Sequence, residues 1–331
     1  MSELTQEAVG AGTAVRPGLA TGAGPVARLL GVLGSARPTT RLWFDLLAPA
    51  AMMAAVYDGP APVRNVVAML SIAVLFHAAA NFFNDSNDVE VDAASSEPSR
   101  QLRPVQVGRI SPRDLNIAGA VLVAASVLLA LLLPWPAVLL LLVVLVLNVA
   151  YNFPPVRLAG RPVVLQVFWP VIWALMFALC ALAMRSGTWR DALPFLAFVA
   201  LFMGVGEGIT QDVRDVDNDA AGGRRTTPVV FGLKASLVVA WLAQLLSVGA
   251  WLWYAQTGEL ALGWTVAGTL VLAGWLAYFL RLAWRLWPGR GGEGAGLDKP
   301  AAKLTHVGSI YVFSAVNLIV VLAAVLPLLV G

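Results

Sequence analysis

Residues 84–92 read NDSNDVEVD and residues 211–219 read QDVRDVDND, and together these two stretches contain eight of the 19 acidic residues of the chain. The aspartates repeat with a constant separation of 127 residues, so that Asp85, Asp88 and Asp92 correspond to Asp212, Asp215 and Asp219. A basic segment follows each stretch. This spacing predicts an internal repeat, and the two halves of such a membrane bundle bring their equivalent loops together around a shared space.

The repeat extends beyond the acidic residues. After a three-residue deletion, Pro104-Val105 corresponds to Pro228-Val229 and Gly108 to Gly232, at a separation of 124 residues. We therefore expect the second to fifth membrane helices to be repeated as the sixth to ninth, with the first helix outside the repeat.

Composition predicts the solvent around these segments. Hydrophobic residues make up 59% of the 331-residue chain and charged residues 12%, against about 25% charged residues in a usual soluble domain. Together with long uncharged apolar runs, this indicates an all-α integral membrane protein. The single cysteine, Cys180, excludes an intrachain disulfide. The chain contains no phosphate-binding nucleotide loop and no zinc-ligand spacing, and nucleic acid is not an expected partner.

Nine apolar segments are long enough, or nearly so, to cross a bilayer about 30 Å thick, which takes roughly 20 helical residues. They lie at residues 42–57, 64–84, 114–133, 136–153, 163–184, 191–211, 234–256, 261–286 and 305–330. Residues 1–36 contain no such segment and no secretory signal, and we expect them to form a mobile tail. The chain is thus interpreted as this tail followed by one membrane domain over residues 37–331.

The basic residues predict the orientation of this domain. When the nine segments are threaded through a bilayer, 19 of the 22 lysines and arginines fall on the side that carries the two acidic stretches. The opposite side holds only Arg64, Arg185 and Arg190. By the positive-inside rule, the acidic stretches and the N-terminus are expected in the cytoplasm, with the protein in the plasma membrane.

The acidic stretches have the character of a magnesium site. On a helix, Asn84, Asp88 and Asp92 would share one face, and like charges at this spacing destabilise a bare helix by ~0.2–0.5 kcal/mol per pair. A divalent cation would reverse that penalty, and ligands that are all oxygen favour Mg²⁺. The predicted metal ligands are Asn84, Asp88, Asp92, Asp215 and Asp219, with Asp85 and Asp212 assisting catalysis.

The neighbouring basic residues have the character of a diphosphate site. Arginine binds phosphate oxygens through two parallel N–H groups, and the candidates are Arg100, Arg103, Arg157, Arg224 and Arg225. Metal ions and arginines beside an apolar cavity are what an allylic diphosphate requires, because they stabilise the leaving diphosphate while its hydrocarbon tail stays in the membrane. The remaining carbocation could be stabilised by the aromatic face of Tyr151.

At these residues the sequence resembles the UbiA superfamily of intramembrane prenyltransferases. The first stretch matches the motif NDxxDxxxD, and the second matches DxxxD at Asp215 and Asp219. Similar matches occur in YNFPPVR at 151–157, in GRRTTP at 223–228 and in the pair Arg37-Pro38. The segment SRQLRP at 99–104 departs from the family pattern but leaves the metal motifs intact.

The resemblance implies a nine-helix bundle whose central cavity is capped by cytoplasmic loops. It also implies that Mg²⁺ ions at the two motifs bind an isoprenoid diphosphate. The prenyl group would then pass to a lipophilic acceptor, with an aromatic ring expected, and diphosphate would be released.

Four further polar residues at membrane depth are candidates for binding the acceptor. They are Asp45, His77, Asn81 and Glu207. Ionisable groups in a membrane span are costly and usually face a cavity or a partner. One of them could orient an acceptor hydroxyl or remove a proton after alkylation, or each could simply be paired between helices.

Two other functions fit part of the pattern. A terpene cyclase of the same fold would ionise the same diphosphate but let the cation react with its own alkene. A transporter would explain the duplicated halves, although the charges gather at one membrane face rather than at the midplane.

Overall fold

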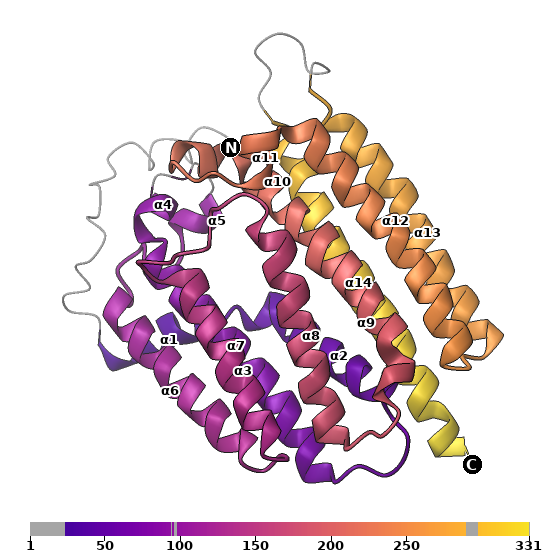
Figure 1. The fold of residues 1–331 in the computed structure, drawn as a ribbon. Helices are drawn as coiled ribbons and strands as arrows, with labels where there is room; N and C mark the ends of the chain where they lie inside the picture. Colours follow the sequence, from indigo (N-terminus) through magenta and orange to yellow (C-terminus); the bar gives the residue numbers. More distant parts are fainter. Residues whose placement is uncertain (1–23, 94, 96–97, 289–296, 331) are drawn as a thin grey trace, which may run out of the picture.

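The computed structural model describes residues 24–93, 95, 98–288 and 297–330, which form helices and contain no strand (Figure 1). The elements in chain order are α1 (Pro25–Ser35), α2 (Pro38–Ala55), α3 (Val63–Asn87), α4 (Val89–Ala93), α5 (Pro98–Gln101), α6 (Pro112–Ala130), α7 (Pro136–Asn152), α8 (Val164–Met184), η2 (Trp189–Ala192), α9 (Leu193–Val199), η3 (Ala200–Glu207), α10 (Gly208–Ala221), α11 (Thr227–Phe231), α12 (Leu233–Thr257), α13 (Leu262–Arg285) and α14 (Lys299–Val330). Several helices begin with proline, whose missing N–H group costs nothing in the first turn.

The chain crosses the membrane through long apolar helices. Within the described residues, seven are long and apolar enough to span a bilayer: α3, α6, α8, the continuous run from η2 to α10, α12, α13 and α14. The predicted segments at 42–57 and 136–153 form apolar helices of fewer residues, Trp43–Ala55 and Pro136–Asn152. The protein is therefore an integral membrane protein, while the count of nine crossings stays a prediction.

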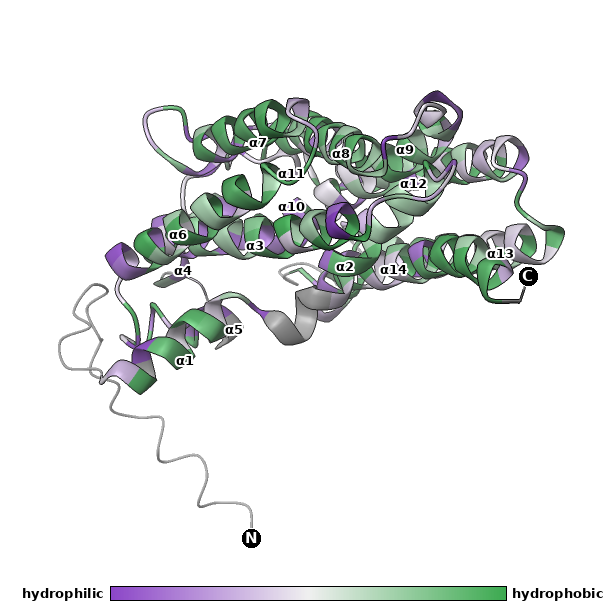
Figure 2. Cartoon of the chain, turned by 90° about the horizontal axis from the view of Figure 1, so that it is seen from below, coloured by the Kyte–Doolittle hydropathy of each residue, from purple (hydrophilic) through white to green (hydrophobic). Residues whose placement is uncertain are grey.

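The helices form one bundle in two halves. α3 packs on α6 and α7 on α8 in the first half, and α12, α13 and α14 pack in succession in the second (Figure 1). α2 joins the halves because it contacts α3, α8 and α14. Apolar residues run along the outward faces of the helices in Figure 2, as expected for surfaces in contact with lipid.

The run from η2 to α10 changes its helical geometry midway. Residues Ala200–Glu207 form a π-helix, a rare geometry that is frequent at functional sites. Gly204 lies so close to Pro170 of α8 that a Cβ atom would come within 2.7 Å of the proline ring. Glycine is therefore required for this contact between α8 and η3, which positions α10 and its acidic residues.

The N-terminal region differs from the sequence expectation. Residues 1–23 of the predicted tail lie outside the described residues, whereas Pro25–Ser35 form α1. The helix lies against the segment that follows α5, because the Cβ positions of Gly31 and Gly34 are 3.2 Å from Ile110 and Pro104. A tail extending to residue 36 is thus wrong for this part, and the reason is that two glycines allow the helix to pack closely.

Candidate active site

The first acidic stretch is divided between two helices. α3 ends at Asn87, and Asp88 leaves helical geometry, with φ −99° and ψ 13°, before α4 begins. The Asn84 amide donates to Asp88 Oδ2 at 3.1 Å, so these two side chains share a face. Asp92 instead turns toward Arg100, whose Nη1 lies 2.9 Å from its carboxylate. The prediction that Asn84, Asp88 and Asp92 share one helical face is therefore wrong, because the helix is interrupted at Asp88.

The second acidic stretch lies on one continuous helix. Asp212, Asp215 and Asp219 all belong to α10, and all three are buried. Arg214 binds the neighbouring Asp215 through two N–H groups, with Nε 2.8 Å from Oδ1. Asp212 accepts a long hydrogen bond of 3.5 Å from Gln166 of α8.

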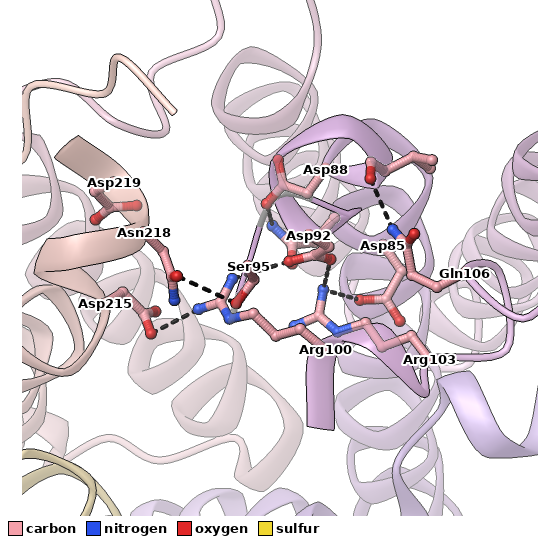
Figure 3. A network of polar contacts seen from close by, with 12 residues as sticks. Asp85, Asp88, Asp92, Ser95, Arg100, Arg103, Gln106, Asp215, Asn218 and Asp219 are labelled. Carbon is pink, nitrogen blue, oxygen red and sulfur yellow. Dashed lines mark hydrogen bonds and ion pairs between the residues drawn. The ribbon is translucent and has the colours of Figure 1, made fainter. Parts of the chain in front are cut away.

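Two arginines link the two acidic stretches in a reciprocal way, and Figure 3 shows the contacts of the first of them, Arg100. Arg100 contacts Asp92 of its own repeat at 2.9 Å and Asp215 of the other repeat at 2.6 Å. Arg224 contacts Asp219 of its own repeat at 3.7 Å and also pairs with Asp88 of the other repeat. The two arginines are 124 residues apart, which is the separation of the repeat in this region. The predicted duplication thus brings equivalent residues into equivalent contacts.

Further arginines complete the network. Arg103 lies 3.0 Å from Asp85 and also pairs with Asp92, and Arg157 lies 3.2 Å from Asp88. Arg37, at the start of α2, pairs with Asp85. This network buries five aspartates in ion pairs at one end of the bundle.

A cavity of about 920 Å³ opens beside this network. Its lining includes the predicted site residues Asn84, Asp85, Asp88, Arg100, Arg103, Tyr151, Asp212, Asp215, Asp219 and Arg224. Asp92 and Arg157 do not line it and reach it only through their ion-pair partners. Arg225 is exposed and does not line this cavity, and its backbone N–H donates to the Gly160 carbonyl.

Burial and charge act in opposite directions outside the membrane spans. Burial raises the pKa of Asp92 above its ordinary value, even though Arg103 and Arg100 act to lower it. Burial also disfavours the charged form of Arg100 and Arg224, but their aspartate partners outweigh it and raise both pKa values. The two linking arginines are therefore permanently charged.

A smaller, mostly apolar cavity of about 200 Å³ adjoins the first. Arg37, Asn84, Tyr151 and Gln211 line both cavities, so the two meet at these residues. The Tyr151 ring stacks on Phe168, with centroids 4.6 Å apart. This inner cavity reaches between α2, α3, α7 and α8, away from the charged network.

The inner cavity holds the polar residues that the sequence singled out. Asp45, His77, Asn81 and Glu207 all line it. His77 Nδ1 contacts Asp45 across α2 and α3, and His306 Nδ1 lies 2.7 Å from Glu207. The two histidines of the chain thus both contact carboxylates. Two buried N–H groups in the lining, Asn81 Nδ2 and Trp169 Nε1, have no hydrogen-bond partner within the described part of the chain.

Sequence reasoning missed several residues of the site. In the sequence, Arg37 stands out only as part of the pair Arg37-Pro38, and Arg214 is only one of the 19 basic residues on the side of the acidic stretches. Lys299 and Lys303 of α14 also line the larger cavity. The signal that could have found the lysines is their place at the start of the last helix, on the same membrane side as both motifs.

The residues present fit a magnesium–diphosphate complex, although they form no ready metal cage. Among the described residues, no three His, Cys, Asp or Glu side chains are arranged to hold a metal ion. Arginines already form ion pairs with these carboxylates, as Arg224 does with Asp88. Asp85 Oδ2 is buried in the lining with no partner among the described residues, so it can accept a further ligand. A metal–diphosphate complex offers the carboxylates a cation and the arginines an anion, so the existing pairs can exchange.

Comparison with known sequences identifies relatives of this chain. The chain matches the model of the UbiA prenyltransferase family over residues 46–293. It is 34% identical over 167 residues to digeranylgeranylglyceryl phosphate synthase of Natronomonas pharaonis, which covers 50% of this chain and 57% of that protein. It is 30% identical over 234 residues to 4-hydroxybenzoate octaprenyltransferase of Pseudomonas entomophila, which covers 70% of this chain and 74% of that protein. The chain thus spans little more than half the length of the first relative.

Comparison with solved structures supports the fold. A UbiA homologue from Archaeoglobus fulgidus bound to DMAPP and Mg²⁺ aligns with a TM-score of 0.62 at 20% identity, covering 88% of this chain and 98% of that chain. The apo structure of a UbiA homologue from Aeropyrum pernix K1 aligns with a TM-score of 0.63 at 19% identity, covering 87% and 97%. At these identities the likeness establishes a shared fold.

Proposed function

The chain belongs to the UbiA prenyltransferase family, and from that premise we propose that it transfers a prenyl group from an isoprenoid diphosphate to a lipophilic acceptor. The observation that carries this proposal is the pair of arginines shared between the two acidic stretches, beside a charged cavity that meets an apolar one. Such a junction suits a substrate with a diphosphate head and a hydrocarbon tail.

The diphosphate and its metal ions would bind in the larger cavity. Asn84, Asp88, Asp215 and Asp219 line it and supply the oxygen ligands that Mg²⁺ prefers. When bound, Mg²⁺ would neutralise the charge that develops on the leaving diphosphate. The substrate would draw Arg100 and Arg224 from carboxylate to phosphate, a tetrahedral anion that presents two oxygens to the same two N–H groups.

The other predicted residues would support these ligands. Asp92 lies behind the cavity wall, where we propose that it holds Arg100 and Arg103 in place, with its assignment as a direct metal ligand becoming the weaker alternative. Arg157 would steady Asp88 in the same way. Asp85, with one oxygen free of any partner in the described chain, and Asp212 would assist in the metal site.

The prenyl cation would form where the two cavities meet. The Tyr151 ring lines both and stacks on Phe168, and Trp169 lies 6.2 Å from it. Aromatic faces attract a cation within about 6 Å of their centre. This arrangement would stabilise the allylic cation as the diphosphate leaves, while the apolar walls exclude water that would otherwise capture it.

The acceptor would occupy the inner cavity, and an aromatic hydroxyl compound fits its polar groups. The contact with Asp45 would hold the His77 ring in place, so that a neutral His77 can take a proton from the acceptor. The Asn81 and Trp169 N–H groups, which have no partner among the described residues, would donate to an oxygen of the acceptor. We further propose that the acidic end of the bundle faces the cytoplasm, with the protein in the plasma membrane.

The proposal can be tested on full-length protein in lipid nanodiscs. The protein is incubated with Mg²⁺ and allylic diphosphates of several lengths, with and without hydroxybenzoates and dihydroxynaphthoates, and diphosphate release and products are measured. We expect release that requires both Mg²⁺ and an aromatic acceptor and yields a prenylated arene. Release of a cyclic terpene without acceptor would replace this function by cyclisation. Absence of release with every substrate would contradict the proposal.

A further inference from the structure

A groove of about 900 Å³ lies at the end of the bundle opposite the acidic residues. Arg64, in the first turn of α3, lines it, whereas the acidic stretch begins at the other end of the same helix, about 30 Å away at 1.5 Å per residue. The groove therefore takes no part in the chemistry described above. Its volume falls within the ~300–1,000 Å³ typical of sites for molecules of lipid or drug size.

The walls of the groove are apolar and come from two regions of the first half and one of the second. The turn between α6 and α7 contributes residues 131–134, α8 contributes Ala174, Phe177 and Leu182, and α9 contributes Leu193 and Leu196. Leu131 and Leu132 are exposed at its edge. Walls of this kind suit hydrocarbon chains that enter sideways from the membrane.

Two arginines give the groove a positive charge. Arg64 and Arg185 both line it and are exposed, and neither has an ion pair within the described residues. They are two of the three basic residues at this end of the protein. Trp189 also lines the groove and is partly exposed, in the position that tryptophan favours at a membrane–water interface.

The acidic residues of this end do not neutralise the groove. Asp58, Asp191 and Glu259 are absent from its lining. Asp58 accepts hydrogen bonds from the turn at 186–188, including one of 2.7 Å from the Gly187 N–H, which lowers the pKa of Asp58. The Asp58 carboxylate thus holds the turn that carries Ser186 into the groove, without lining the groove itself.

We propose that this groove binds a phospholipid whose headgroup carries a net negative charge. The acyl chains lie along the leucines of α7 and α9 and the apolar face of α8, and the phosphate contacts Arg64 and Arg185. Two arginines bind a phosphodiester through several N–H groups, and pockets of basic residues between membrane helices select anionic headgroups. This site is independent of the proposed prenyl transfer, because it shares none of its lining residues with the two cavities at the other end.

Native mass spectrometry of the purified full-length protein tests the proposal. Phosphatidylglycerol and phosphatidylcholine with identical acyl chains are titrated separately, and the dissociation constant of the first bound lipid is measured. For the wild-type protein we expect tighter binding of phosphatidylglycerol. Each interfacial arginine contributes about fivefold in affinity, so Arg64→Gln/Arg185→Gln is expected to lose about 25-fold for phosphatidylglycerol and little for phosphatidylcholine.

Matched variants separate the site from general charge and from misfolding. Arg190→Gln removes the third arginine of this end, which lies over the Trp189 ring at 5.3 Å and does not line the groove, and should leave the preference intact. Arg64→Lys/Arg185→Lys keeps the charge and should retain most of the affinity. Ala178→Trp, which fills the groove, should weaken both lipids. Equal affinity of wild type for the two lipids, or an unchanged preference in the double glutamine variant, would overturn the proposal.

Discussion

The two acidic stretches have the same spacing of aspartates but different structures. The second is one continuous helix, and three of its four aspartates, Asp212, Asp215 and Asp219, line the larger cavity. The first is interrupted at Asp88, and its last aspartate, Asp92, is completely buried behind the cavity wall. Asp88 and Asp215 are therefore equivalent in sequence and both line the cavity. Asp92 and Asp219 are equivalent in sequence and in their contact to an arginine of their own repeat, but only Asp219 lines the cavity. A duplicated motif can thus keep its contacts to arginine while its two copies differ in which aspartates reach the cavity.

The largest loss of turnover is expected at the equivalent aspartates Asp88 and Asp215. Asp88→Ala and Asp215→Ala should each reduce turnover by roughly 10²–10³-fold, because each removes an oxygen ligand and frees two arginines in a buried site. Steady-state diphosphate release in nanodiscs measures this, with membrane expression as the control for folding. Near-normal turnover in only one of the two would break their equivalence.

A somewhat smaller effect is expected at the linking arginines. Arg100→Lys and Arg224→Lys keep the charge but lose the second N–H group, which the reciprocal contacts to both repeats require. We expect both to weaken diphosphate binding by about 10–50-fold, since one such contact is worth about 1.5–2.5 kcal/mol. Isothermal titration with a non-hydrolysable diphosphate analogue gives the values. If one lysine variant binds as wild type, the reciprocity has no functional meaning.

Substitutions of Asp219 and Asp92 are expected to have different effects, the first on Mg²⁺ binding and the second on diphosphate binding. Asp219→Asn removes a carboxylate from the cavity lining and should raise the Mg²⁺ concentration for half-maximal activity by about tenfold, or ~1.4 kcal/mol. Asp92→Asn leaves the lining intact and should instead weaken diphosphate binding through Arg100 and Arg103. Magnesium titrations at saturating substrate distinguish the two. A tenfold shift in Asp92→Asn as well would restore Asp92 as a direct metal ligand.

The smallest effect on turnover is expected at the one remaining acidic residue of each stretch. Glu90 and Asp217 are exposed and line neither cavity. Glu90→Ala and Asp217→Ala should change turnover by less than about twofold, because exposed surface substitutions usually stay within about 0.5 kcal/mol. These variants are the matched controls for the four aspartates above, and a large loss in either would show that net charge matters more than position.

Much of the architecture could be predicted because it depends on local patterns. Apolar runs between glycine and proline breaks predicted helices at all nine segments, and each of the nine is helical in the structure. The meeting of the two acidic stretches could also be predicted, because their constant separation points to repeated halves. The contacts of Arg100 and Arg224 could not, since they depend on how the two halves face each other.

Other parts of the site were beyond the sequence for similar reasons. Arg225 was predicted to bind phosphate beside Arg224, yet the turn after α10 leaves it exposed. Arg37 lies 48 residues before its partner Asp85, and nothing in the local sequence links the two. The contact between His77 and Asp45 likewise joins two helices that only tertiary packing brings together.

By itself the sequence determined that the chain is a helical membrane protein, which residues carry its charges, and that its acidic motif is duplicated. These follow from composition, periodicity and spacing, which are properties of neighbouring residues. Only the tertiary structure decided which aspartates face the cavity, which arginines join the repeats, and where two arginines meet an apolar groove. The physical reason is that burial and ion pairing depend on distances between helices, and those are set by the packing of the whole bundle.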